Sequence, residues 1–174
     1  WSSPSNGDGA AGNLVQQLNA AIGQPTYGVV PAPTTTGTDA IRVAMIYKPA
    51  VLTLQGGALS DGDRVNNRPP MAATFKAANG GKFSVGVNHF KSKGGCGGAT
   101  GGHQGPGHGQ GCWVTARLNQ AKRLTSYFLP QVVQASSDPD VLVIGDLNAY
   151  AFENPINHLS ASGMVNQIER FVRP

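Results

Sequence analysis

The chain is poor in charged residues and has no apolar run long enough to cross a membrane. Only 13% of its 174 residues are charged, and no basic stretch precedes an apolar leader. The sequence therefore predicts neither a membrane span nor a signal peptide. It also has no run of basic residues like those of nucleic-acid-binding arms. The formal charge of +4 mildly favours a polyanionic or phosphate-bearing ligand.

Glycine and proline, in contrast, are abundant. The 24 glycines and 12 prolines indicate strands and long loops, which makes an all-helical protein the least expected class. No internal repeat and no linker between two domains is visible, and a chain of this length can bury roughly 70% of its unfolded surface in one core. We therefore expect one domain of mixed α and β structure over residues 1–174.

Cysteine is scarce, with only Cys96 and Cys112, and these two bracket a glycine-rich segment without apolar anchors. A disulfide closing this loop, residues 96–112, would contribute about 3 kcal/mol in the chain-entropy model. The bridge implies an oxidising compartment, so we expect a secreted (extracellular) or periplasmic protein. The alternative is a metal site built from both cysteines with His103 and His108, although these spacings match no zinc-finger pattern.

Hydrophobic periodicity predicts several elements. Helices are expected at 12–22, 114–133 and 154–161, and strands at 25–31, 41–47, 51–54, 71–75, 82–89 and 141–144. The first helix is expected to pack one face on a sheet. Residues 55–70 are expected to form a long loop, Asn79-Gly80 a hairpin turn, and Pro130 a bend or end of the second helix.

The run Val141–Ile144 followed by Gly145-Asp146-Leu147-Asn148 is the most informative segment. Its four aliphatic residues predict a short strand buried on both faces. Asp146 and Asn148 follow at the spacing that puts alternate side chains on one side of an extended chain. A carboxylate and an amide there suit metal binding, or the positioning and deprotonation of a water. The alternative is an Asx turn, which is common after strands.

The order of five segments carries a family resemblance. They are IRVAMIYKP, NRPPMAATF, FSVGVNHFKSKG, a helix, and VLVIGDLNAYAFENPI. Together they resemble the endonuclease/exonuclease/phosphatase superfamily, which is deoxyribonuclease I-like, and in particular its secreted bacterial nucleases with NHxKSKG and GDxNAY motifs. The resemblance runs from about Asn6 to the C-terminus. It implies an α/β (α+β) fold, a two-sheet sandwich of mostly antiparallel strands with flanking helices.

The resemblance also implies roles for individual residues at the strand ends. Asp146 matches the aspartate that orients or deprotonates the attacking water, and Asn148 the asparagine that holds the scissile phosphate or a metal. His89 matches a histidine that hydrogen-bonds the phosphate and shares acid/base work, and Arg68 an arginine that faces the phosphate. The cofactor implied is Mg²⁺ or Mn²⁺, with Ca²⁺ as a further possibility, and Asp146 and Asn148 are its expected ligands.

Further residues near these motifs are weaker candidates. Asp39 is expected to accept a hydrogen bond from His89 and raise its pKa, which would keep it cationic, unless Asp39 only caps a surface loop. Lys91 and Lys93 are expected to contact the nucleic-acid backbone, or to be a solvated strand end. Asn88 either reaches the site or caps the turn.

The sequence also departs from the family pattern. The family's metal-binding glutamate would precede Asn6-Gly7-Asp8-Gly9, where Trp1–Ser5 contains no acidic residue. A first strand bearing an asparagine, and a terminal aspartate and histidine, also lack counterparts. We therefore expect the domain to be incomplete at both its N- and C-terminal parts.

The function that follows is a metal-dependent phosphodiesterase, a secreted nuclease that hydrolyses DNA or RNA through a metal- and Asp-activated water. One alternative is a phosphatase or phospholipid phosphodiesterase of the same superfamily. The other is a catalytically inactive, truncated module that binds nucleic acid or a protein. No membrane span and no obligate protein partner is expected.

Overall fold

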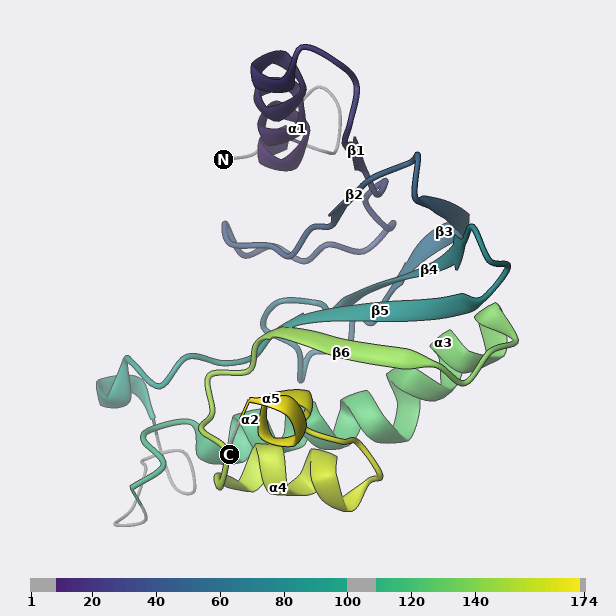
Figure 1. Ribbon diagram of the computed structural model, residues 1–174. Coiled ribbons are helices and arrows are strands. Elements are labelled where there is room, and N and C mark those ends of the chain that lie inside the picture. The colour runs from purple at the N-terminus through teal and green to yellow at the C-terminus, as the bar shows by residue number, and fades with distance from the viewer. Residues whose placement is uncertain (1–8, 100–108, 173–174) are drawn as a thin grey trace.

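A computed structural model describes residues 9–99 and 109–172 and contains two sheets with flanking helices (Figure 1). The helices are α1 (Gly9–Ile22), α2 (Val114–Arg123), α3 (Leu129–Ser136), α4 (Asn154–Ala161) and α5 (Gln167–Phe171), with short helical turns η1 (Cys96–Gly98) and η3 (Leu124–Phe128). The strands are β1 (Gly28–Val29), β2 (Ile46–Tyr47), β3 (Leu52–Ser60), β4 (Met71–Ala77), β5 (Lys82–His89) and β6 (Val141–Asp146). The expected mixed α and β class is confirmed.

The main sheet has four strands in the order β3-β4-β5-β6. The first three pair antiparallel, whereas β5 and β6 are parallel, with His89 opposite Asp146 at the end of the ladder. The strands β1 and β2 form a separate antiparallel pair. Parallel neighbours end at the same edge of a sheet, so the two candidate residues on β5 and β6 meet there.

The main sheet has a different layer on each face. Figure 1 shows α2, α3 and α4 on one side, and α1 with β1 and β2 on the other. On the helical side, Ala72 packs with Leu124, Phe128 and Val132, and on the other side Phe75 packs with Val30, Met45 and Met71. Because successive side chains of a strand point to opposite faces of the sheet, the strands contribute side chains to two separate cores.

The prediction that β6 is buried on both faces is wrong. Val141 and Val143 are half-buried and pack against the helical layer, but Leu142 and Ile144 are each 48% exposed. The reason is position, because β6 is an edge strand and the opposite core extends only as far as the Phe83, Val85 and Val87 side chains of β5. An apolar run on both faces does not by itself reveal which faces are covered.

The predicted helix at 114–133 continues through Pro130 to Ser136. In a regular α-helix, a proline ring collides with the carbonyl one turn earlier. Here a π-helical turn, η3, precedes Pro130, which then lies in the first turn of α3. The wider turn accommodates the ring, so the helix does not end at Pro130.

Other boundaries were set by contacts that the periodicity did not reveal. β3 extends to Ser60 through part of the predicted loop, with an irregular register between Gln55 and Leu59. Gly56 has φ +68°, a conformation that favours glycine, and such bulges hide a strand from pattern reading. β2 covers only Ile46–Tyr47 of the predicted 41–47, and α5 was not predicted. The strand 82–89 and the helix 154–161 are confirmed.

The first helix is confirmed, but its contact with a sheet is limited. It ends at Ile22, as the apolar spacing indicated, and begins at Gly9, three residues before the predicted start. None of its residues is buried, and Leu14 and Ile22 are 50% and 46% exposed. The helix therefore meets the small sheet mainly through β1, as expected for one face, but without burying any of its residues fully.

The predicted disulfide joins Cys96 to Cys112, with Cα atoms 5.6 Å apart. Because both sulfurs are bonded to each other, the alternative metal site is wrong. Its other members, His103 and His108, lie outside the described residues. In the described ranges, no helix is long and apolar enough to cross a membrane.

An ion pair ties the end of β3 to the helical layer. Asp61 is only 5% exposed, and it accepts hydrogen bonds from Arg123 Nε at 2.8 Å and Nη2 at 3.1 Å. Burial raises the pKa of Asp61, but the hydrogen bonds and charge of Arg123 outweigh it and leave that pKa below its ordinary value. The carboxylate is thus more stable as an anion in the folded chain than in the unfolded one.

We predict that Asp61→Asn lowers the free energy of unfolding at neutral pH by about 1–3 kcal/mol, the range for hydrogen bonds to charged groups. Since the folded pKa lies below the unfolded value near 3.8, the stabilisation is present above that pH. It is lost as the pH falls through the folded pKa. Urea unfolding of wild type and variant at neutral and acid pH measures the difference. Asp140→Asn is the control, since Asp140 is exposed, whereas Asp63 is itself 3.7 Å from Arg123; an equal loss in Asp61→Asn and Asp140→Asn would contradict the prediction.

Candidate functional site

The candidate site lies where β5 and β6 end. His89 Nε2 is 3.7 Å from Asp146 Oδ2, and the ladder continues one step further through a bond from Phe90 N to Asp146 O. The imidazole side chain is 23% exposed, whereas the Asp146 side chain is 63% exposed. A partly buried base thus stands beside a carboxylate that solvent and ligands can reach.

The turn after β6 holds Asp146 in place. Gly145 has φ +118°, and a Cβ there would lie 2.0 Å from the Asn88 carbonyl oxygen, so only glycine fits. Asn148, at φ +48°, donates its backbone N–H to Asp146 Oδ1 at 2.8 Å. The Asx turn is therefore present, and it orients the same carboxylate that the chemical hypothesis requires.

The side chain of Asn148 is also anchored. Its Nδ2 donates to the Phe90 carbonyl oxygen at 3.0 Å, which links the turn back to the end of β5. This contact leaves the amide oxygen and one N–H for a ligand. The arrangement suits either predicted role, because the oxygen can bind a metal and the N–H can bind a phosphate.

Arg68 and Asp39 form a pair at this edge. Arg68 Nε donates to Asp39 Oδ2 at 3.2 Å, and Asp39 Oδ1 accepts from the Ile41 backbone at 2.9 Å. The Ile41 bond and the Arg68 charge lower the pKa of Asp39. Arg68 Nη1 is buried and has no hydrogen-bond partner among the described residues. A buried N–H of this kind carries a desolvation cost that an anionic ligand would remove.

The expectation that Asp39 keeps His89 cationic is wrong. The Asp39 carboxylate bonds Arg68 and Ile41 instead. Burial lowers the pKa of His89, and the Arg68 charge lowers it further, whereas Asp146 and Asp39 raise it less. The balance leaves the pKa of His89 below its ordinary value. The imidazole is therefore neutral near pH 7 and can both accept and donate a hydrogen bond.

The two lysines after His89 already have partners. Lys93 Nζ forms an ion pair with Glu153 Oε1 and lies 3.9 Å from the centroid of the Tyr150 ring. Lys91 Nζ lies 4.8 Å from the Trp113 ring. The predicted contacts of both lysines with a phosphate backbone stay predictions, and in the structure each ammonium faces an aromatic ring.

Asn88 is not brought to the site. It precedes His89 on β5, so its side chain points to the opposite face of the sheet. It is 2% exposed, and its Nδ2 donates to the Gly86 carbonyl oxygen at 3.1 Å. The structure therefore gives Asn88 a packing role in the sheet, not contact with a phosphate.

A buried arginine supports the loop that carries the lysines. Arg117 has 0% exposure, and its guanidinium donates to the carbonyl oxygens of Lys91, Cys112 and Gln110 at 3.3, 2.7 and 2.7 Å. Its neighbour Gln120 accepts the Lys91 backbone N–H at 2.8 Å. These contacts join α2 to the segment that follows β5 and to the C-terminal end of the disulfide loop.

The sequence held a signal for these supporting residues. Arg117 and Gln120 lie on the same helical face as Ala121, Leu124 and Phe128, which form the core. A polar side chain on the buried face of a helix needs a partner, so it marks a place where backbone groups must be satisfied. Glu153 is also buried, at 6% exposure, but no periodic pattern around it indicates this, so the sequence did not predict its supporting role.

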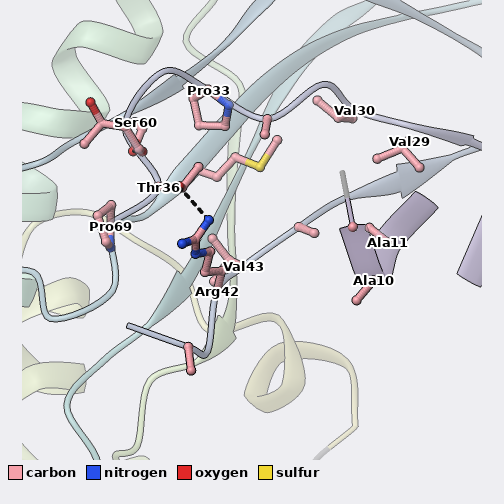
Figure 2. Close-up of a pocket in the computed structure, with 16 residues that line it drawn as sticks. Ala10, Ala11, Val29, Val30, Pro33, Thr36, Arg42, Val43, Ser60 and Pro69 are labelled. Carbon is pink, nitrogen blue, oxygen red and sulfur yellow. Dashed lines mark hydrogen bonds between the residues drawn. The ribbon is translucent and has the colours of Figure 1, made fainter. Parts of the chain in front are cut away.

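Two pockets differ in chemistry. One of about 400 Å³ adjoins the site and is lined by Lys93, Gly145, Asp146, Leu147, Asn148, Ala149 and Tyr150. The other, of about 170 Å³, lies between the start of α1, β1 and the segment 32–44 (Figure 2). Its lining is mostly small and apolar apart from Arg42, which donates to Thr36 Oγ1 at 3.1 Å. It contains none of the predicted site residues, so the first pocket is the candidate site.

The oxygen ligands available at the site suit a metal that also binds substrate and water better than a metal enclosed entirely by protein ligands. Within 9–99 and 109–172, no group of three His, Cys, Asp or Glu side chains could hold a metal ion. Asp146 and Asn148 offer one carboxylate and one amide oxygen. Mg²⁺ commonly binds through one or two carboxylates, with waters and substrate phosphates as its other ligands.

Comparison with known proteins adds no relative. A scan against protein-family models and a search of curated proteins each gave no match to this chain.

We predict opposite effects on the pKa of His89 from two substitutions. Arg68→Met removes a charge that lowers this pKa, so the pKa should rise, whereas Asp146→Asn removes one that raises it, so it should fall. NMR titration of the imidazole signals, assigned with a His89→Gln variant, measures both shifts. Arg170→Met, at an exposed arginine of α5, is the control; equal shifts in Arg170→Met and Arg68→Met would contradict the assignment.

Proposed function

We propose that this chain is a metal-dependent phosphodiesterase of the endonuclease/exonuclease/phosphatase superfamily, a secreted nuclease that hydrolyses DNA or RNA. Its two sheets would then be part of a deoxyribonuclease I-like sandwich. The observation that carries the proposal is the buried, unpartnered Nη1 of Arg68, at an edge that also holds His89 and Asp146. A phosphate oxygen would supply the missing acceptor.

Each residue has a chemical task that its surroundings support. The Arg68 guanidinium, oriented by Asp39, would bind the phosphate and offset the negative charge that develops on its oxygens. Asn148, held by Phe90, would bind the phosphate or the metal. His89, neutral near pH 7, would hydrogen-bond the phosphate and exchange a proton.

The bond-making step would begin at Asp146. Its exposed carboxylate orients the attacking water and takes its proton. The water oxygen forms a bond to phosphorus while the bond to the leaving oxygen breaks. The proton stays on Asp146 or passes to His89, 3.7 Å away, and from there returns to the leaving oxygen. A bound Mg²⁺ or Mn²⁺, held by Asp146 and Asn148, would neutralise charge on the phosphate.

The disulfide supports the cellular part of the proposal. Disulfides persist in oxidising compartments, and Cys96–Cys112 closes a loop whose C-terminal end is bound by Arg117 of α2. An extracellular or periplasmic location is consistent with that chemistry.

One observation favours a second candidate, nucleic-acid binding without turnover. In the part of the chain that the structure describes, no three side chains of the usual metal-binding types gather. Phosphate binding needs Arg68 and Asn148 but not a tightly held metal. The two candidates differ in one measurable property, which is metal-dependent cleavage.

We predict that the protein nicks supercoiled plasmid with Mg²⁺ or Mn²⁺ and that EDTA abolishes the activity. Asp146→Ala should lower the rate by about 100-fold or more, the usual contribution of a positioned acid or base. Asp140→Ala is a matched control, since Asp140 is an exposed aspartate at the opposite end of the same strand.

Three results would change the assignment. Nicking that persists in EDTA, or in Asp146→Ala at the wild-type rate, would show that the site is elsewhere or that a contaminant is responsible. Absence of nicking, together with binding of DNA that weakens with salt, would favour the binding module. Turnover of a phosphomonoester without nicking would favour a phosphatase.

A further inference from the structure

Two aromatic rings beside the site are unusually open to solvent. Tyr150 is 77% exposed and Phe152 is 73% exposed, although large apolar surfaces are normally covered. Only Tyr150 lines the pocket that contains Asp146 and Asn148. Its ring therefore lies next to the place where a scissile phosphate would bind under the proposed function.

The Tyr150 ring is held in place although it is exposed. The Tyr150 carbonyl accepts the Glu153 backbone N–H at 3.0 Å, which closes a turn. Lys93 Nζ lies 3.9 Å from the ring centroid and is itself fixed by its ion pair with buried Glu153. The stem of Lys93 also packs over Gly111, where a Cβ would approach it at 3.1 Å. A ring prepositioned in this way loses little entropy when a ligand contacts it.

The charge balance indicates what kind of ligand fits. Because Glu153 already neutralises Lys93, this lysine is a weak candidate for a separate phosphate ligand. Its main contact is the Tyr150 ring, which it supports by a cation–π interaction. The feature offered to solvent is thus a flat aromatic surface next to an anion site. An aliphatic phosphomonoester or a lipid headgroup has no flat group to use it, whereas a nucleobase does.

We propose that Tyr150, supported by Lys93, is a stacking platform for an unpaired nucleobase adjacent to the scissile phosphate. This inference rests on the proposed function and narrows its substrate to nucleic acid with accessible bases, such as single strands. Stacking on Tyr150 requires the base to leave a duplex, so paired DNA binds less well.

The test measures binding in EDTA, where cleavage cannot interfere. Fluorescence anisotropy compares a labelled oligothymidylate of about eight nucleotides, within the usual site size for single strands, with an abasic oligomer of the same length. The two probes carry the same phosphates and differ in bases. We expect wild type to bind the oligothymidylate more tightly, and Tyr150→Ala to weaken that binding by about 5- to 150-fold while leaving the abasic oligomer almost unaffected.

Matched variants separate stacking from a general effect. Tyr150→Phe and Tyr150→Trp keep a ring and should retain the preference for bases. Phe152→Ala removes an equally exposed ring that does not line the pocket, and it should bind like wild type. Because Tyr150 is so exposed, its removal takes little from the core, and circular dichroism checks that each variant is folded.

The inference is overturned if Tyr150→Ala binds both probes like wild type, if it weakens both equally, or if Phe152→Ala causes the same loss. It is also overturned if wild type does not distinguish the two probes. None of these readouts depends on turnover. Absence of cleavage of both the plasmid and a single-stranded oligonucleotide, with retained, Tyr150-dependent binding, would therefore overturn the proposed enzyme and leave the platform intact.

Discussion

The parallel pairing of β5 with β6 is the constraint on which the candidate site depends. It aligns His89 with Asp146, and a shift of one residue would turn one of them to the other face of the sheet. Parallel strands need a crossover connection, here the helical segment from α2 to α3 that packs its apolar face on the sheet. The core formed by Leu124, Phe128 and Val132 is thus what keeps a base and a carboxylate side by side.

A second group of contacts extends this alignment from the sheet to the loops. Arg117 binds backbone carbonyls of Lys91, which precedes the disulfide loop, and of Gln110 and Cys112 at its C-terminal end, and Asn148 binds the carbonyl that follows β5. Loop carbonyls that would otherwise need water are satisfied by side chains from the rigid layers. The pocket is therefore lined by residues of loops, and these loops are fixed to helix α2 and to the end of β5.

The sequence alone predicted the parts of the molecule that depend on local pattern. Residues 82–89 alternate clearly, and Pro155 opens the helix at 154–161, so both elements were found. The segment after Val141–Ile144 was identified as a site because its polar residues follow a strand at fixed spacing. The cysteines were paired correctly since only two exist and the loop between them has no anchors.

The remainder depends on contacts between distant segments, which no local pattern encodes. Asp39 lies 29 residues from Arg68 and pairs with it, and burial together with the Arg68 charge lowers the pKa of His89 by more than Asp39 and Asp146 raise it. Lys93 and Glu153 are 60 residues apart, so the lysine could not be recognised as neutralised. Likewise, the exposure of Leu142 depends on which layer reaches β6, a property of packing and not of composition.

The buried residue that binds the loop carbonyls is an arginine, Arg117, and this affects how the site responds to acid. Burial lowers the pKa of Arg117 and Glu153 opposes this, yet a guanidinium remains protonated throughout the range in which imidazoles titrate. The three carbonyls that it binds therefore keep their donor while His89 changes its charge. Under the proposed function, an acid limb in a rate profile would therefore reflect titration of groups at the site, such as His89, and not loss of the contacts that Arg117 makes with the loop.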